Sequence, residues 1–143
     1  MKKKYRNEKG DLHREVGPAI EWADGTTEWW VNGQLHREGG LPAIERDNGT
    51  KEWWSNGYRH RTDGPAIEYA DGQKDWFING KRHRTDGPAI EHPDGRKEWF
   101  VNGELHRTDG PAIETKDGDK YWFFHGVQYY EDFPPGYDEP NTI

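Results

Sequence analysis

Residues 10–32 read GDLHREVGPAIEWADGTTEWWVN, and close copies of this 23-residue stretch fill most of the chain. The copies that follow occupy residues 33–56, 57–79, 80–102 and 103–125. The second copy carries one extra residue, near Gly40. Self-similarity at a fixed period of this length is typical of repeat architectures, in which each unit packs mainly against its neighbours. The sequence therefore predicts an array of five tandem units.

The two ends of the chain deviate from this unit. Residues 1–9 contain a worn half-unit, and residues 126–143 contain a partial sixth unit with an acidic, proline-rich tail. In the sixth unit, Tyr129 and Tyr130 replace the usual His-Arg pair. Terminal repeats must cover the open ends of the core, so both ends are interpreted as caps. The tail is expected either to fold over the last hairpin or to hang free as a recognition peptide.

Each unit holds two short β-prone runs separated by a turn. In the first unit the runs are residues 18–22 and 28–32, and the turn contains Asp24-Gly25. Asp-Gly at such a place predicts a two-residue type I′ turn, because both residues tolerate the positive φ that it needs. The Asn-Gly pairs between units mark a second reversal. Stacked hairpins predict an all-β fold, either an elongated antiparallel meander sheet or a β-solenoid.

A two-residue turn also determines which residues face each other. Ile20 should lie opposite Trp29, and Glu21 opposite Glu28. One face of the hairpin would then be apolar, because side chains alternate between the faces of a strand. The residues expected on that face are Ile20, Trp22, Trp29 and Val31. The isoleucine and the first tryptophan are identical in all five units, so the two columns are predicted to form one continuous core.

Composition limits the fold class. Only 30% of the residues are hydrophobic and the mean hydropathy is −1.32, values that would ordinarily indicate disorder. The missing aliphatic mass is supplied by eight Trp and seven Tyr residues, most of which recur at repeat positions. Aromatic side chains can each bury a large area. An ordered array is therefore expected.

Charge and cysteine content limit the function. The net charge of −7 argues against general nucleic-acid binding, because phosphate contacts need an excess of Lys and Arg. The chain has no Cys, which excludes a disulfide framework and fits a reducing cytoplasm. No stretch approaches the roughly 20 apolar residues of a membrane span, and no apolar segment follows the MKKK start as in a signal peptide. A cytoplasmic protein without a membrane span is expected.

The pattern resembles MORN repeats, or a divergent bacterial and bacteriophage form of them. The shared elements are the run NGKRH at residues 79–83, the PDG turn at residues 93–95 and the 23-residue spacing. The resemblance covers residues 10–126, although EWWxN stands where the family has YxGxW. It implies an elongated sheet of stacked hairpins and a non-catalytic scaffolding role, with membrane association in some members. Similarity to phage-encoded repeat proteins also implies a viral source.

Every unit contains an adjacent His-Arg pair, which has two interpretations. The pairs are His13-Arg14, His36-Arg37, His60-Arg61, His83-Arg84 and His106-Arg107. As a binding surface they would form a row of anion sites, each a guanidinium beside an imidazole. As structural groups, the arginines would neutralise hairpin glutamates such as Glu21 and Glu28, which would otherwise oppose each other as like charges. Invariance through five units favours the structural interpretation.

Two further columns are candidate binding residues. The second aromatic column consists of Trp30, Trp54, Phe77, Phe100 and Phe123. It would form an interaction patch if one sheet face is open, and part of the core if the sheet coils over it. The variable column consists of Trp22, Arg46, Tyr69, His92 and Thr115. A surface that recognises one partner is expected to differ between units, although sequence drift would give the same picture.

Catalysis, cofactors and metals are not expected. Ser55 is the only serine and Cys is absent, so the common nucleophiles are nearly missing. The glycines lie in turns at repeat spacing and form no nucleotide-binding loop. Histidines about 10 Å apart on successive units could not share one zinc ion. The glutamates of one unit offer too few oxygens for a hard divalent cation.

These observations predict a protein that acts by binding. The leading hypothesis is a protein–protein interaction module whose acidic charge favours a basic partner, such as a phage protein that inhibits or titrates a host defence factor. A second hypothesis is sequestration of a small anionic ligand, such as a nucleotide signal, by the His-Arg pairs and aromatic residues. A third is an antitoxin or immunity-type binder. Open edge strands would also allow end-to-end homo-oligomers.

Overall fold

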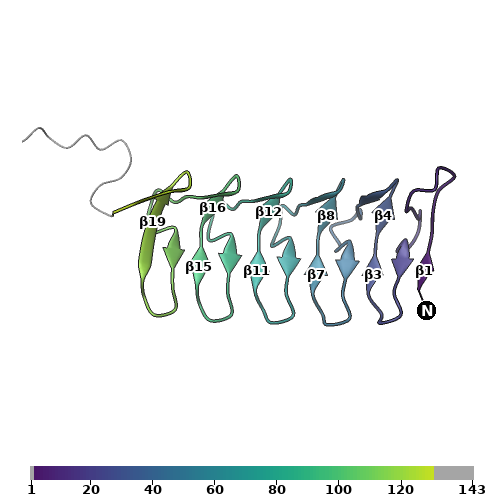
Figure 1. Cartoon of the computed structure of the whole chain (residues 1–143), viewed down its shortest axis with the longest axis horizontal. Coiled ribbons are helices and arrows are strands. Elements are labelled where there is room, and N and C mark those ends of the chain that lie inside the picture. Colours follow the sequence, from purple (N-terminus) through teal and green to yellow (C-terminus); the bar gives the residue numbers. More distant parts are fainter. Residues whose placement is uncertain (1, 131–143) are drawn as a thin grey trace, which may run out of the picture.

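The computed structural model describes residues 2–130 and shows no helix in that range. The predicted all-β array is confirmed. Twelve strands form one long antiparallel meander sheet, and four separate two-stranded hairpins lie along the ends of its strands (Figure 1). The sheet is open and does not close into a barrel, so the structure has the meander of the two expected architectures. The acidic tail, residues 131–143, lies outside the described residues.

The main sheet takes two strands from each unit. Its spatial order is β1 (Lys3–Lys4), β2 (Ile20–Glu21), β3 (Thr27–Glu28), β6 (Ile44–Glu45), β7 (Lys51–Glu52), β10 (Ile67–Glu68), β11 (Lys74–Asp75), β14 (Ile90–Glu91), β15 (Lys97–Glu98), β18 (Ile113–Glu114), β19 (Lys120–Phe124) and β20 (Val127–Tyr129). The second strand of each unit pairs with the first strand of the next, as β7 does with β10. Two strands advance the array by about 10 Å per unit.

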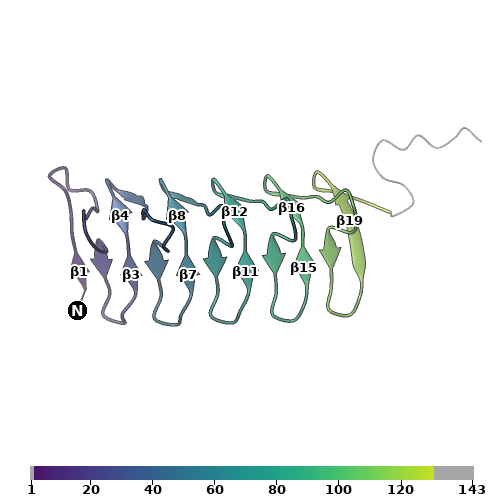
Figure 2. The ribbon, with the colours of Figure 1, turned by 180° about the vertical axis from the view of Figure 1, so that it is seen from behind.

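The small hairpins extend the second strand of the first four units. They pair β4 (Trp30–Val31) with β5 (Gln34–Leu35), β8 (Trp54–Ser55) with β9 (Tyr58–Arg59), β12 (Phe77–Ile78) with β13 (Lys81–Arg82), and β16 (Phe100–Val101) with β17 (Glu104–Leu105). Their turns are the Asn-Gly pairs, and both residues have positive φ, 47° at Asn32 and 80° at Gly33. The type I′ turn therefore lies here, between units. Figure 2 shows the same row of hairpins from behind.

The prediction of a two-residue turn at Asp24-Gly25 is wrong, because the loop there has three residues. The Trp22 backbone N–H donates to the Thr26 carbonyl at 2.9 Å, which leaves a three-residue loop between them. Within this loop only Gly25 has positive φ. The Asp24 carboxylate accepts a hydrogen bond from the Thr26 backbone N–H at 2.8 Å, which fixes the turn and lowers the pKa of Asp24. A type I turn closed by a left-handed glycine is the common three-residue hairpin loop.

The extra loop residue shifts the register of every hairpin by one position. Ile20 lies opposite Glu28, and Glu21 lies opposite Thr27, instead of the predicted partners. A shift of one residue moves side chains to the other face of the sheet. The predicted apolar face is therefore wrong for Trp29 and Val31, although Ile20 and Trp22 share a face as expected, and the two glutamates of a unit do not oppose each other.

The isoleucine and tryptophan columns lie on opposite faces of the sheet. We call the face that carries the isoleucines and Glu28 the isoleucine face. Trp22 and Trp30 lie there, and both donate their indole N–H to the Glu28 carboxylate at 3.0 Å. We call the other face the linker face, because Trp29 on that face contacts Arg37 of the following linker. A linker is the segment from a His-Arg pair to the next proline. Trp53 and Ile67 still belong to one buried cluster with Ala66 and Phe77. The prediction that both columns form one core on a single face is wrong.

The core is a thin seam along the middle of the sheet. The buried positions that recur in every unit are Ala19, Ile20, Ala43, Ile44, Ala66, Ile67, Ala89, Ile90, Ala112 and Ile113. The alanines are 0% exposed and the isoleucines are at most 9% exposed. Neighbouring residues of a strand point to opposite faces. Burial of both shows that both faces are covered at this level of the sheet.

The N-terminal strand β1 takes the place of a preceding unit. Lys3 pairs with Glu21 as Lys97 pairs with Glu114 in the interior. Tyr5 takes the position of the stacked tryptophan, with the Arg14 guanidinium 4.0 Å above its ring. Lysines on an edge strand hinder pairing with a second edge. This end of the array therefore disfavours end-to-end association.

Replacement of Asn79 by alanine tests the turn assignment. Asn79 has φ 48°, and left-handed backbone costs an ordinary L-residue about 1 kcal/mol or more. We expect Asn79→Ala to lower the free energy of unfolding in urea by about 1 kcal/mol. The control is Asn79→Gly, which tolerates this φ and should unfold near the wild-type midpoint. Equal loss in both variants would contradict a conformational cause.

Candidate functional site

The arginine of each His-Arg pair is clamped between two units. Its guanidinium stacks on the tryptophan of the preceding unit, at 3.9 Å for Arg37 over Trp29 and 3.8 Å for Arg61 over Trp53. The same contact joins Arg84 to Trp76 and Arg107 to Trp99. A partly buried guanidinium over an indole is a favourable cation–π pair. These contacts connect successive units on the linker face.

A glycine closes the other side of this clamp. A Cβ added to Gly64 would lie 2.9 Å from Cζ of Arg61. The equivalent distances are also 2.9 Å at Gly17 and Gly87, and 2.8 Å at Gly110. Real Cβ contacts are essentially never this short. The glycine of the Gly-Pro-Ala run is therefore present because the guanidinium occupies the space of a side chain.

Hydrogen bonds use further donors of the same arginines. Arg61 donates from Nη1 to the Pro65 carbonyl at 3.1 Å and to Glu68 at 3.2 Å, and from Nε to Asp63 at 3.0 Å. The ion pair with the first-strand glutamate occurs in all five units, from 3.1 to 3.5 Å. These guanidinium groups are only 16–30% exposed. The predicted pairing of linker arginines with Glu21-type carboxylates is present in the structure.

The histidine of each pair supports the neighbouring turn. Nδ1 of His13, His36, His60, His83 and His106 accepts the backbone N–H of the left-handed residue at 2.9–3.0 Å. A neutral imidazole with Nδ1 as acceptor carries its proton on Nε2. In the first two units Nε2 faces Glu15 at 2.9 Å and Glu38 at 2.6 Å. In the last three units a threonine takes the place of that glutamate.

A column of carboxylates lies on the isoleucine face. Its members are Glu28, Glu52, Asp75 and Glu98. Asp75 is fully buried and Glu52 is 3% exposed. Such groups need charged or hydrogen-bonding partners to remain ionised. The Glu52 carboxylate forms ion pairs with Arg46 at 2.7 Å and with Arg59 at 3.3 Å. The Asp75 carboxylate forms an ion pair with Arg82 at 3.4 Å.

The variable column supplies one partner to three of these carboxylates. Trp22, Arg46 and His92 each donate to the carboxylate of their own unit, at 3.0, 2.7 and 2.9 Å. Burial, with a contribution from the Asp75 carboxylate, raises the pKa of Tyr69 at the same position. Thr115 has no carboxylate opposite it, because Tyr121 replaces the acid in the last unit. Three of the five variable residues thus have a structural role, as partners of the acid of their own unit.

The second aromatic column does not form an open stripe within residues 2–130. Phe77 is buried at 7% exposure, and the other four members are half-buried. Arginines cover them on the isoleucine face. The Arg59 guanidinium lies 4.9 Å from the Trp54 ring, and that of Arg82 lies 5.3 Å from Phe77. Of the two interpretations of this column, the structure shows partial burial without coiling of the sheet.

The most exposed charges of the linker face are acids that the sequence interpretation overlooked. They are Glu15, Glu38, Asp63, Asp86 and Asp109, one in each linker, with side chains 75–90% exposed. Repetition of Thr-Asp-Gly in the last three linkers was the available signal. The linker arginines lie beneath these acids and are far less exposed. The same face also carries exposed lysines on the sheet strands, opposite the first-strand glutamates: Lys51, Lys74, Lys97 and Lys120. The linkers themselves therefore present carboxylates, while the strands beside them present cations.

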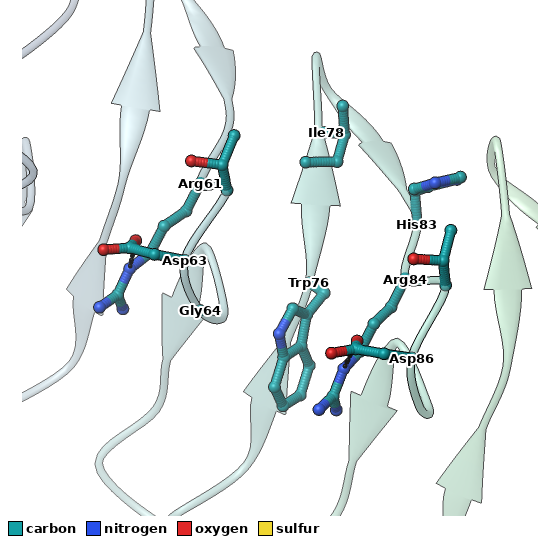
Figure 3. Close-up of a pocket in the computed structure, with 10 residues that line it drawn as sticks. Arg61, Asp63, Gly64, Trp76, Ile78, His83, Arg84 and Asp86 are labelled. Atoms are coloured by element: carbon teal, nitrogen blue, oxygen red, sulfur yellow. Dashed lines mark hydrogen bonds and ion pairs between the residues drawn. The ribbon is translucent and has the colours of Figure 1, made fainter.

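Two equivalent grooves lie between successive Thr-Asp-Gly linkers. The first is bounded by the linker of Arg61 and Asp63 on one side and by Trp76, Arg84 and Asp86 on the other (Figure 3). The second repeats the same lining one unit further along. Their volumes are about 420 and 570 Å³. Identical grooves at unit spacing form the candidate binding site.

Comparison with known proteins gives no match to a protein-family model and none to a curated protein. The resemblance to MORN repeats therefore remains a prediction. The described residues include no helix that could cross a membrane. Over the same range no three His, Asp or Glu side chains gather in a way that could hold a metal ion.

Substitution of Gly64 tests the clamp. We expect Gly64→Ala to lower the free energy of unfolding by about 1–3 kcal/mol, the usual cost of overpacking, because Arg61 has no room to move away from Trp53. In an Arg61→Ala background the same substitution should cost much less, since the added methyl group then meets empty space. Urea denaturation of the four proteins measures this coupling. Additive effects would contradict the clamp.

His106 should respond to pH differently from a free histidine. Burial, followed by the charge of His125, lowers the pKa of His106 below its ordinary value of 6.5. The unfolded chain then binds the proton more readily. The stability from this group is thus complete above pH 6.5 and is lost as the pH falls from 6.5 toward the folded pKa. An NMR titration of His106 measures the shift.

The control for this titration is His125→Asn, which installs the residue of the other four units at the same left-handed position. The two rings stack with centroids 4.2 Å apart. Removal of the second imidazole should raise the pKa of His106. An unchanged pKa in this variant would show that the neighbouring charge has no effect.

Proposed function

We propose that this protein is a non-catalytic binding module that recognises a basic region of a partner protein through its linker face. The observation that carries this proposal is the row of exposed linker carboxylates, one per unit at about 10 Å spacing. The net charge of the whole chain, −7, is also negative, which favours a basic partner. Complementary charge accelerates association and excludes acidic partners.

The arrangement of the arginines supports a basic partner over a small anion. An anion at a His-Arg pair would compete with bonds that the guanidinium already makes to a carbonyl and two carboxylates, as at Arg84. It would also find His83 engaged at Nδ1. The exposed groups above them are acids. The linker aspartates beside these arginines therefore disfavour an anion at the His-Arg pairs, where sequestration of a nucleotide would need it.

A triple substitution tests the role of the linker acids. Asp63→Asn, Asp86→Asn and Asp109→Asn together keep the oxygen that accepts from arginine Nε and remove three exposed charges. We expect this variant to lose about tenfold or more in affinity for the basic proteins that the wild type captures from a host lysate, at up to about 1 kcal/mol per exposed pair. Biolayer interferometry with the captured proteins gives the affinities. Affinity should also fall as salt is raised.

The matched control changes three aspartates at the opposite ends of the hairpins. Asp71→Asn, Asp94→Asn and Asp117→Asn alter the net charge equally, and Asn48 already occupies this loop position in the second unit. The control should bind like the wild type. Equal weakening of both variants would show that only net charge matters, and the proposal of a linker-face site would be wrong.

A further inference from the structure

Each groove between Thr-Asp-Gly linkers combines the groups that hold an organic cation. In the first groove, Asp63 and Asp86 place exposed carboxylates on opposite sides, and the Trp76 indole lies between them (Figure 3). Arg61 and Arg84 also line the groove, but each is only 19–21% exposed and bonds to its aspartate through Nε, whereas the aspartates are 75–84% exposed. Ile78 adds apolar surface. Carboxylates bind guanidinium and ammonium groups by charge-assisted hydrogen bonds, and an indole adds a cation–π contact.

The protein already shows this recognition internally. The Arg84 guanidinium covers part of Trp76 at 3.9 Å and bonds to Asp86 at 3.0 Å. The rest of the indole lines the groove on the side of Asp63. A second cation placed there would have the same two kinds of partner, a carboxylate and an aromatic ring. The neighbouring groove offers the same set with Asp86, Trp99 and Asp109.

We propose that the two grooves receive consecutive Arg or Lys side chains of one extended partner segment in the polyproline II conformation, with a cationic residue at every third position. This inference rests on the proposed function, and it specifies the conformation and spacing of the basic partner. The segment runs along the array, across the linkers, and places one cationic side chain in each groove.

Spacing favours this conformation. One unit advances the array by about 9.6 Å, because it adds two strands at about 4.8 Å each. Three residues of polyproline II rise about 9.3 Å and return the side chain to the same face. In a β-strand, residues on one face repeat at about 6.7 Å or 13 Å, which misses the grooves. An α-helix reaches about 10.5 Å in seven residues, a less close match.

The polar groups of the linkers favour polyproline II over a helix. Thr62, Thr85 and Thr108 expose their side chains beside the grooves. Nε2 of His83 and His106 carries a proton and belongs to the same lining. A polyproline II backbone has no internal hydrogen bonds and can offer its carbonyls to these donors. The carbonyls of a helix are already used within the helix.

The experiment uses the full chain and four synthetic peptides with three arginines each. Three are proline-based, with arginine at every second, every third or every fourth position, and one is an alanine-based helix with arginine at every seventh. Fluorescence anisotropy at fixed salt gives each Kd. The every-third peptide is expected to bind at least about tenfold more tightly than the other three. The linker triple variant should remove this preference, and the loop triple control should keep it.

NMR adds a readout that charge alone would not move. The every-third peptide should shift the indole N–H signals of Trp76 and Trp99 and leave that of Trp22, on the isoleucine face, unchanged. Equal binding of all four peptides, weakened by the linker substitutions, would overturn the spacing and leave the proposed function standing. Tightest binding by the helical peptide would also overturn it. If none of the four peptides binds, and the linker substitutions also leave the affinity for captured proteins unchanged, then both the proposed spacing and the proposed function would be overturned.

Discussion

The stack of arginine on tryptophan is the interaction on which the rest of the array depends. Each strand of the main sheet is only two residues long, except at the C-terminal end. Backbone pairing of such short strands would not hold a hairpin in place by itself. The guanidinium of one unit stacks on the indole of the preceding unit at every junction between the five units. At the last three of these junctions a glycine of its own linker closes the other side, whereas Leu41 takes that position beside Arg37. A carbonyl and a strand glutamate then fix the orientation of the guanidinium.

This clamp also explains how an open sheet with so few aliphatic residues is stable. The alanine and isoleucine pair fills the centre of the sheet, and Arg-Trp stacks and aromatic side chains cover its two faces. On the isoleucine face the acids form a second network. Glu52 and Asp75 are almost completely buried, and each receives at least one arginine. Both networks use long side chains whose apolar stems cover the core while their charged ends are paired.

Functionally, the division of charge between buried and exposed groups is the important feature. The linker arginines make structural contacts, and the aspartates beside them, each bonded to an arginine Nε through one oxygen, are 75–84% exposed. The same linker thus has two parts: residues that hold the preceding unit and residues that project into solvent. A repeat built in this way presents one groove, lined by two aspartates and two arginines, wherever two Thr-Asp-Gly linkers follow each other.

The sequence by itself determined the repeat, its period, the all-β class and the stacking of hairpins, because these follow from turn residues and periodicity that each unit carries locally. The worn half-unit in residues 1–9, which contains Tyr5, could be recognised from the sequence in the same way. The register was decided only by the tertiary structure. An Asp-Gly pair fits both a two-residue and a three-residue loop. The hydrogen bond from Thr26 to Asp24 stabilises the longer one, which reverses the faces of the second-strand residues relative to the first strand. The roles of Arg61 and Asp63 also depended on that choice, since only the observed register brings Trp53 and Glu68 to the face that the linker contacts.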